Sequence, residues 1–125
     1  MKILLIEDEQ PLREDILETL ECMYFDVIGA ENGLVGVQLA LQHKPDLIIC
    51  DIMMPKLDGY DVLKTLRQNP ETSHIPFIFL SAKTEKADIQ KGRDLGANDY
   101  LTKPFTIAQL SQAISAQLLK REKIE

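Results

Sequence analysis

The sequence predicts an α/β fold in which a parallel five-stranded sheet is flanked by helices. Short apolar runs alternate five times with longer segments of helical periodicity, and this alternation is typical of strands that are joined by crossover helices. At 125 residues, with 45% hydrophobic side chains, the chain has the size and the apolar content of one domain. It contains no internal repeat and no low-complexity stretch.

The five expected strands are short and apolar. They lie at Lys2–Ile6, Phe25–Ala30, Asp46–Cys50, Phe77–Leu80 and Asp99–Leu101. Four of them run into polar side chains at the carboxyl end, and these polar residues are Glu7, Asp8, Asp51, Ser81 and Lys103. The carboxyl ends of parallel strands share one edge of the sheet, which is where such folds bind ligands. We therefore expect these side chains to meet in one small cleft.

Four of the expected helices begin at a recognisable residue. Pro11 lies near the first turn of the first helix, which is a favoured position for proline, and Asn32, Asp58 and Thr106 are N-cap residues for the second, third and fifth helices. The second helix ends before Pro45, since a proline disfavours the helical conformation in the residue that precedes it. The apolar residues at helical spacing are Leu12, Ile16, Leu17, Leu20; Leu34, Val37, Leu41; Val62, Leu63, Leu66; and Ile107, Leu110, Ile114, Leu118.

The expected fourth helix, Thr84–Leu95, differs from the others. Its apolar residues are only Ala87, Ile89 and Leu95, and Gly92 in its middle costs about 1 kcal/mol relative to alanine. Weak packing is typical of a region that moves or opens locally. An ordinary surface helix remains the alternative interpretation.

Composition and charge limit the possible partners and the location. A net charge of −6 speaks against direct nucleic-acid binding, which requires basic patches, and suits a domain that attracts cations. The chain opens with a strand in place of a signal peptide, and no apolar run is long enough to span a bilayer. We therefore expect a cytoplasmic protein without membrane contact. Cys22 and Cys50 are expected to be small apolar core residues.

Three carboxylates in one cleft require positive charge. Two like charges about 4 Å apart repel by roughly 4 kcal/mol at an effective dielectric constant of about 20. Lys103 offsets one charge, and a divalent cation could offset two more. Because the pattern offers only oxygen ligands, Mg²⁺ is favoured. A metal, a lysine and a hydroxyl around Asp51 indicate a phosphoryl-transfer site in which this carboxylate is the nucleophile.

The polar residues belong to motifs that occur in a familiar order. These are Glu7-Asp8; Asp51 with Met54-Pro55 and Asp58-Gly59; Ser81-Ala82; Gly96-Ala97-Asn98-Asp99-Tyr100; and Lys103-Pro104-Phe105. In this order they resemble the receiver domain of two-component response regulators, over residues 1–119. Residues 120–125 are then a charged tail or the start of a linker. The resemblance implies a flavodoxin-like (βα)5 fold, a doubly wound parallel sheet with the strand order 2-1-3-4-5.

The resemblance also implies roles for the acidic residues. Asp51 would accept a phosphoryl group from a sensor histidine kinase or a phosphotransfer protein. Asp8, Asp51 and the backbone carbonyl of Met53 would bind Mg²⁺, or Mn²⁺, and Glu7 would act mainly through water. Such a domain is a regulatory switch and not an enzyme, since it catalyses only its own phosphorylation and dephosphorylation.

The remaining roles concern the switch and its output. By the resemblance, Ser81 would bond the phosphoryl group, Tyr100 would be the switch aromatic, and the Lys103–Pro104 bond would be cis. The output surface would comprise the fourth helix, the fifth strand and the fifth helix. A downstream protein, a fused output domain or a second copy of the chain would bind there. Residues 110–117 lack the arginine that winged-helix regulators usually use for dimerisation, so a domain acting alone and a piece of a longer regulator both stay open.

Two other classes of protein with similar sheets fit the sequence less well. Hydrolases of the haloacid-dehalogenase type also use a strand-end aspartate with Mg²⁺, but they are expected to carry a second aspartate two residues later, where this chain has Met53. Flavodoxins are expected to have a phosphate loop rich in serine, threonine and glycine after the first strand. Here that loop is Glu7-Asp8-Glu9-Gln10, which would repel a phosphate.

Overall fold

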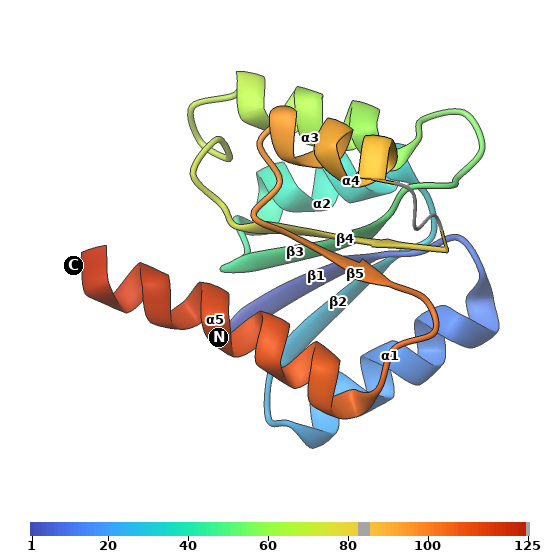
Figure 1. Cartoon of the computed structure of the whole chain (residues 1–125), viewed down its shortest axis with the longest axis vertical. Helices are drawn as coiled ribbons and strands as arrows, with labels where there is room; N and C mark the ends of the chain where they lie inside the picture. The colour runs from blue at the N-terminus through green and yellow to red at the C-terminus, as the bar shows by residue number, and fades with distance from the viewer. Residues whose placement is uncertain (83–85, 125) are drawn as a thin grey trace.

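A computed structural model describes residues 1–82 and 86–124, and for 120–124 the backbone only. The chain forms one five-stranded sheet between two layers of helices (Figure 1). The strands are β1 (Lys2–Ile6), β2 (Asp26–Ala30), β3 (Leu47–Asp51), β4 (Phe77–Ser81) and β5 (Asp99–Thr102). Their order is β2-β1-β3-β4-β5, and every neighbouring pair is parallel. The expected fold class and strand order are confirmed.

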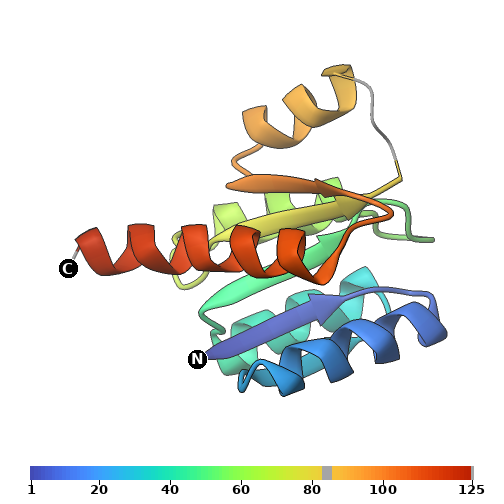
Figure 2. The same ribbon diagram turned by 60° about the horizontal axis from the view of Figure 1, so that its bottom comes forward.

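The helices divide between the two faces of the sheet (Figures 1 and 2). They are α1 (Gln10–Cys22), α2 (Gly33–His43), α3 (Gly59–Gln68), α4 (Lys86–Asp94) and α5 (Ile107–Ile124). One hydrophobic core lies between the sheet and α1 and α5, and the other lies beneath α2 and α3. In β1, Ile3 faces the first core and Leu4 the second, because side chains alternate along a strand. Both faces are therefore apolar, as in other buried parallel sheets.

The expected helix starts are confirmed. The side chains of Asn32 and Asp58 each accept a hydrogen bond of 2.9 Å from the backbone N–H three residues later. At the start of α5, the Thr106 hydroxyl accepts from the Gln109 N–H at 3.0 Å, and the Gln109 amide oxygen accepts from the Thr106 N–H at 2.9 Å. This reciprocal pair is a capping box. After α2, Lys44 adopts a left-handed conformation with a φ of 47°, so the helix ends before the proline.

Three expectations about individual side chains are wrong. Leu34 is 55% exposed, because α2 faces the sheet with Gly36 and Ala40. Ile107 is 65% exposed, because it borders an open groove of about 560 Å³ between α1 and α5. Cys22 is exposed, whereas Cys50 is buried as expected. Helix α1 faces the core with Ile16 and Leu20. Cys22 follows Leu20 by two positions, which places it on the other side of the helix, and it is therefore exposed.

Helix α4 is as weakly packed as its sequence indicates. Among its described residues, only Gly92 is buried. The first residue of the expected helix, Thr84, lies outside the described residues.

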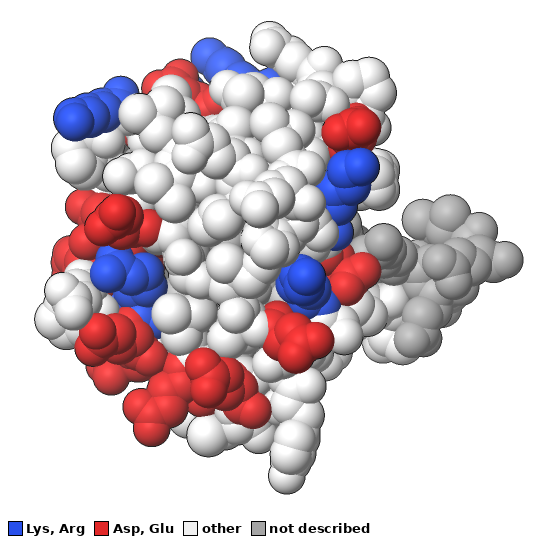
Figure 3. Space-filling view, turned by 180° about the vertical axis from the view of Figure 1, so that it is seen from behind, with Lys and Arg blue, Asp and Glu red and all other residues white. Residues whose placement is uncertain are grey.

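The surface varies strongly in charge. Helix α2 contains no Asp, Glu, Lys or Arg. The face seen in Figure 3 has a broad uncharged area at its centre, with acidic and basic side chains around its border. Each described helix lacks either the length or the apolar character needed to cross a membrane.

The close approach of α2 to β1 can be tested at Gly36. A Cβ atom at this position would lie 2.5 Å from Cδ1 of Ile6, which is itself fully buried. We expect Gly36→Ala to lower the free energy of unfolding by about 1–2 kcal/mol, because overpacking outweighs the gain of about 1 kcal/mol in helix propensity. Urea denaturation measures the change. Gln38→Ala, at an exposed position of the same helix, should be nearly neutral, and equal stability of the two variants would contradict the packing.

Candidate functional site

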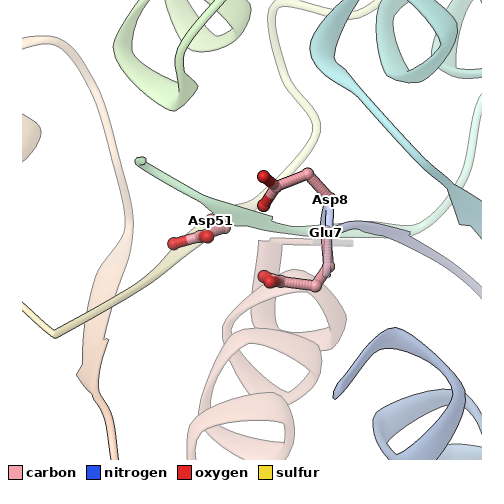
Figure 4. Close-up of side chains that lie close together, drawn as sticks. All are labelled: Glu7, Asp8 and Asp51. Atoms are coloured by element: carbon pink, nitrogen blue, oxygen red, sulfur yellow. The ribbon is translucent and has the colours of Figure 1, made fainter. Parts of the chain in front are cut away.

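The polar residues that follow the strands meet at one edge of the sheet, as expected. Asp51 ends β3 and Ser81 ends β4, while Glu7 and Lys103 directly follow β1 and β5. Asp8 reaches the same place, and each of the three acidic residues offers a carboxylate oxygen within 4.8 Å of the other two. Figure 4 shows these three side chains pointing into a common space. The structure therefore brings together five residues from four segments that are distant in sequence.

Burial differs sharply among the three acids. Glu7 is fully buried and Asp51 is 4% exposed, whereas Asp8 is half-buried. The Nζ atom of Lys103 lies 3.4 Å from Oε2 of Glu7 and 3.4 Å from Oδ2 of Asp51. The two buried carboxylates thus share one ammonium group, and Lys103 balances one of three negative charges.

Burial perturbs the pKa values of both buried acids. Burial raises the pKa of Glu7 to about 7, and repulsion from Asp51 adds to the rise, while Lys103 opposes it. The pKa of Asp51 is also raised by burial, again against the effect of Lys103. A second positive charge would relieve both groups. Because the ligands on offer are carboxylate oxygens, the cluster fits a hard divalent cation such as Mg²⁺.

Backbone hydrogen bonds hold the loop after β1. The N–H of Glu7 donates to the carbonyl of Ala30 at 3.0 Å, which continues the pairing of β1 with β2. Its own carbonyl accepts a bond of 2.8 Å from Nη1 of Arg13 in α1. No sequence pattern indicates this role for Arg13, because its acceptor is a backbone atom. The acid pair is thereby fixed relative to both β2 and α1.

The loop after β3 depends on Gly59. The N–H of Gly59 donates to the carbonyl of Ile52 at 2.9 Å, so α3 begins directly against the end of β3. A Cβ atom at Gly59 would lie 2.4 Å from the backbone oxygen of Asp51. No side chain fits there unless the backbone moves. The Asp58-Gly59 motif thus combines a helix cap with a close contact that holds Asp51 in place.

Ser81 and Lys103 are adjacent at the end of β4. Ser81 is fully buried, and its carbonyl accepts a bond of 2.8 Å from the Lys103 N–H. Burial raises the pKa of Tyr100 in β5, and a hydrogen bond with Ser81 partly opposes the rise. The Lys103–Pro104 bond is cis, as expected. Met53, which follows Asp51 by two positions in the sequence, is 60% exposed.

Comparison with known proteins decides the family. The family model described as the response regulator receiver domain matches residues 3–115. The chain belongs to this family. Receiver domains are regulatory domains of two-component systems, and phosphorylation on an aspartate with a dependence on Mg²⁺ is a general property of the family.

Individual relatives agree with the assignment. The receiver is 38% identical over 123 residues to the DNA-binding dual master transcriptional regulator RpaA of Synechocystis, covering 98% of this chain and 51% of that protein. It is 41% identical over 121 residues to the alkaline phosphatase synthesis transcriptional regulatory protein PhoP of Bacillus subtilis, covering 97% and 50%. The chain thus spans about half the length of these curated relatives.

Solved structures show the same fold. A response regulator receiver domain protein from Clostridium thermocellum superposes with a TM-score of 0.92 at 29% identity, covering 99% of this chain and 98% of that one. A chemotaxis protein of Vibrio cholerae superposes with a TM-score of 0.88 at 27% identity, covering 92% and 96%.

The acidic cluster predicts stabilisation by Mg²⁺. Binding to the folded state alone should raise the free energy of unfolding by about 2.7 kcal/mol at one hundred times the Kd. We expect Asp8→Asn to lose this gain, yet to be no less stable than the unmodified receiver without Mg²⁺, because one repelling charge is gone. Thermal melts with and without Mg²⁺ measure both effects.

The matched control is Glu9→Gln, which removes a charge from an exposed side chain in the same loop. It should keep the full response to Mg²⁺. A melting temperature of the unmodified receiver that does not depend on Mg²⁺ would reject the metal site.

Proposed function

We propose that Asp51 is the phosphoacceptor of this receiver and takes its phosphoryl group from a sensor histidine kinase or a phosphotransfer protein. The observation that carries the proposal is the position of Asp51, in contact with the ammonium group of Lys103 and on the strand next to that of Ser81. Its Oδ2 atom lies 3.4 Å from Nζ of Lys103. Its register partner in β4 is Leu80, the residue before Ser81. Glu7 also contacts Lys103 but extends from β1, which does not pair with β4.

The reaction is the displacement of a phosphohistidine by a carboxylate. One oxygen of Asp51 attacks phosphorus, the P–O bond forms as the P–N bond breaks, and the leaving imidazole takes a proton from solvent. The Lys103 ammonium and the Ser81 hydroxyl donate hydrogen bonds to the phosphoryl oxygens as negative charge gathers there. Both donors are held by the bond between the Lys103 N–H and the Ser81 carbonyl.

Asp8, Asp51 and the backbone carbonyl of Met53 would hold Mg²⁺, or Mn²⁺, with Glu7 acting through water. When bound, the metal supplies positive charge that balances the negative charge of the three carboxylates and of the phosphoryl group. Glu7, which is fully buried, is suited to positioning the cluster and not to meeting a phosphodonor.

The partner that delivers the phosphoryl group must approach the same edge of the sheet. The groove between α1 and α5 is mostly apolar, and Lys103 is one of its lining residues. A kinase or phosphotransfer protein seated at the site would therefore contact this groove.

The output follows from the neighbours of Ser81. Phosphorylation adds up to about two negative charges. When Ser81 bonds the phosphoryl group, its contact with Tyr100 changes, and α4 and β5 carry the change to the surface they form with α5. A downstream protein, a fused output domain or a second receiver reads this surface, and the acidic domain itself makes no nucleic-acid contact. The shift is a two-state equilibrium that phosphate biases.

The remaining proposals concern boundaries and location. Residues 1–119 act as the switch and 120–125 as a charged tail or the start of a linker, in a cytoplasmic protein. Catalysis is confined to the phosphorylation and dephosphorylation of the domain itself.

Covalent chemistry tests the acceptor. With Mg²⁺ and acetyl phosphate, the protein should gain one base-labile phosphoryl group, which intact mass spectrometry detects. Asp51→Asn should abolish the adduct, while Lys103→Ala should reduce its yield because phosphoryl charge is less well balanced. Asp26→Asn, at the exposed start of β2 on the opposite edge of the sheet, should react normally. An adduct that persists in Asp51→Asn would reject the assignment.

The output route can be followed by backbone amide chemical shifts with and without beryllofluoride, a mimic of the phosphoryl group. We expect changes at Tyr100 and through Lys86–Asp94, because Ser81 connects the site to these elements. If shifts change only in the loops around Asp51, the proposed route is wrong.

A further inference from the structure

Helix α4 packs closely on aromatic rings at Gly92, its one buried residue among those that the structure describes. The rings of Tyr60 in α3, Phe79 in β4 and Tyr100 in β5 form a row, with centroids 5.4 Å and 6.2 Å apart. A Cβ atom at Gly92 of α4 would lie 3.0 Å from the Phe79 ring and 3.6 Å from that of Tyr100. The glycine that is unfavourable for helix formation thus lets α4 approach the row closely.

Tyr60 holds α4 from the side of α3. It is 6% exposed, and Nζ of Lys91 in α4 lies 4.3 Å from the centroid of its ring. This is a favourable cation–π distance. The Tyr60 hydroxyl lies 3.4 Å from the backbone oxygen of Asp88, which is long for a hydrogen bond between oxygens. The ring and the ammonium group therefore carry most of the contact.

The loop after α4 is held far more firmly, again from α3. The guanidinium group of Arg67 donates to the carbonyl of Gly96 at 3.0 and 3.3 Å, to the carbonyl of Ile75 at 2.7 Å and to the side chain of Asn98 at 3.1 Å. Gly96 has a φ of +105°, a conformation that favours glycine. One end of α4 is thus anchored at Gly96, while its body depends on the ring row and on Tyr60.

We propose that Tyr60 is a positioning residue of the switch, which holds α4 through Lys91 and couples the position of α4 to Asp51 through Phe79 and Tyr100. The inference rests on the proposed function. Because the three rings are in contact, a displacement of Tyr100 changes the surface on which Gly92 and Tyr60 pack. The seam between α3 and α4 is then part of the output surface.

Thermodynamic linkage supplies the test. If the phosphoryl site and the position of α4 are coupled, a variant that destabilises one position of α4 must also change the affinity for a phosphoryl mimic. Lys91→Gln removes the cation from an exposed position, and Tyr60→Leu removes the ring. Arg93→Gln is the matched control, since it removes the same charge from an exposed position of the same helix. Tyr60→Phe keeps the ring and should behave like the unmodified receiver.

Two measurements are made on each variant with Mg²⁺ present. The first is hydrogen exchange of the backbone amides of Lys86–Asp94, which should be at least about fivefold faster in Lys91→Gln and Tyr60→Leu. The second is the beryllofluoride concentration that half-saturates the amide shifts around Asp51. It should change by about threefold or more, in the same direction in both variants, and stay within about twofold in Arg93→Gln.

The outcomes separate the two proposals. Faster exchange with an unchanged half-saturating concentration would give Tyr60 a structural role only and overturn the coupling. Lys91→Gln that behaves like Arg93→Gln would overturn the cation–π contact as the restraint on α4, even if Tyr60→Leu fails to fold. An unmodified receiver that does not bind beryllofluoride would overturn the proposed function itself, and the coupling with it.

Discussion

Two buried carboxylates that face one ammonium group are the constraint around which the domain is arranged. Glu7 and Asp51 share Lys103 at 3.4 Å, and burial raises the pKa of both acids. Such a cluster opposes folding, so it persists only where the surrounding structure over-determines it. Here the parallel sheet brings three strand ends together, and the apolar cores on both faces hold that sheet. The two cores supply the stability of the domain, and this allows the strand ends to carry polar groups that are unfavourable for folding.

The parts of the fold that could be predicted from the sequence are those governed by local pattern. Strand positions, helix caps and the meeting of Asp51 with Lys103 follow from apolar runs and from the residues that end them. The strand order came from the resemblance to receivers, since no local pattern contains it. The exposure of Leu34 and Ile107 was mispredicted for a tertiary reason. The side of a helix that faces the sheet depends on how closely the helix approaches the sheet. In α2 the small residues face the sheet, because Gly36 allows a close approach to Ile6.

Backbone acceptors explain what sequence reasoning could not find at the site. Arg13 donates to the Glu7 carbonyl, Arg67 to the Gly96 carbonyl, and the Tyr60 hydroxyl approaches the Asp88 carbonyl. Every residue has a carbonyl group, so no sequence pattern marks the one that is used. The acidic cluster was predictable because its members are side chains with distinctive chemistry. The side chains that hold the loops could not be predicted, because their partners are backbone carbonyls with no distinctive chemistry. These contacts nevertheless decide which elements are rigidly joined.

The two cysteines have a practical consequence. Cys50 is buried beside Asp51, and burial raises the pKa of its thiol well above the usual range, which disfavours the reactive thiolate. Cys22 is exposed at the end of α1. This thiol lines a pocket with Asp15 and Ile107, two residues that also line the groove between α1 and α5. These 125 residues therefore offer one exposed thiol for a fluorescent or spin label, and a label there would lie beside the groove at which we expect the phosphodonor to dock.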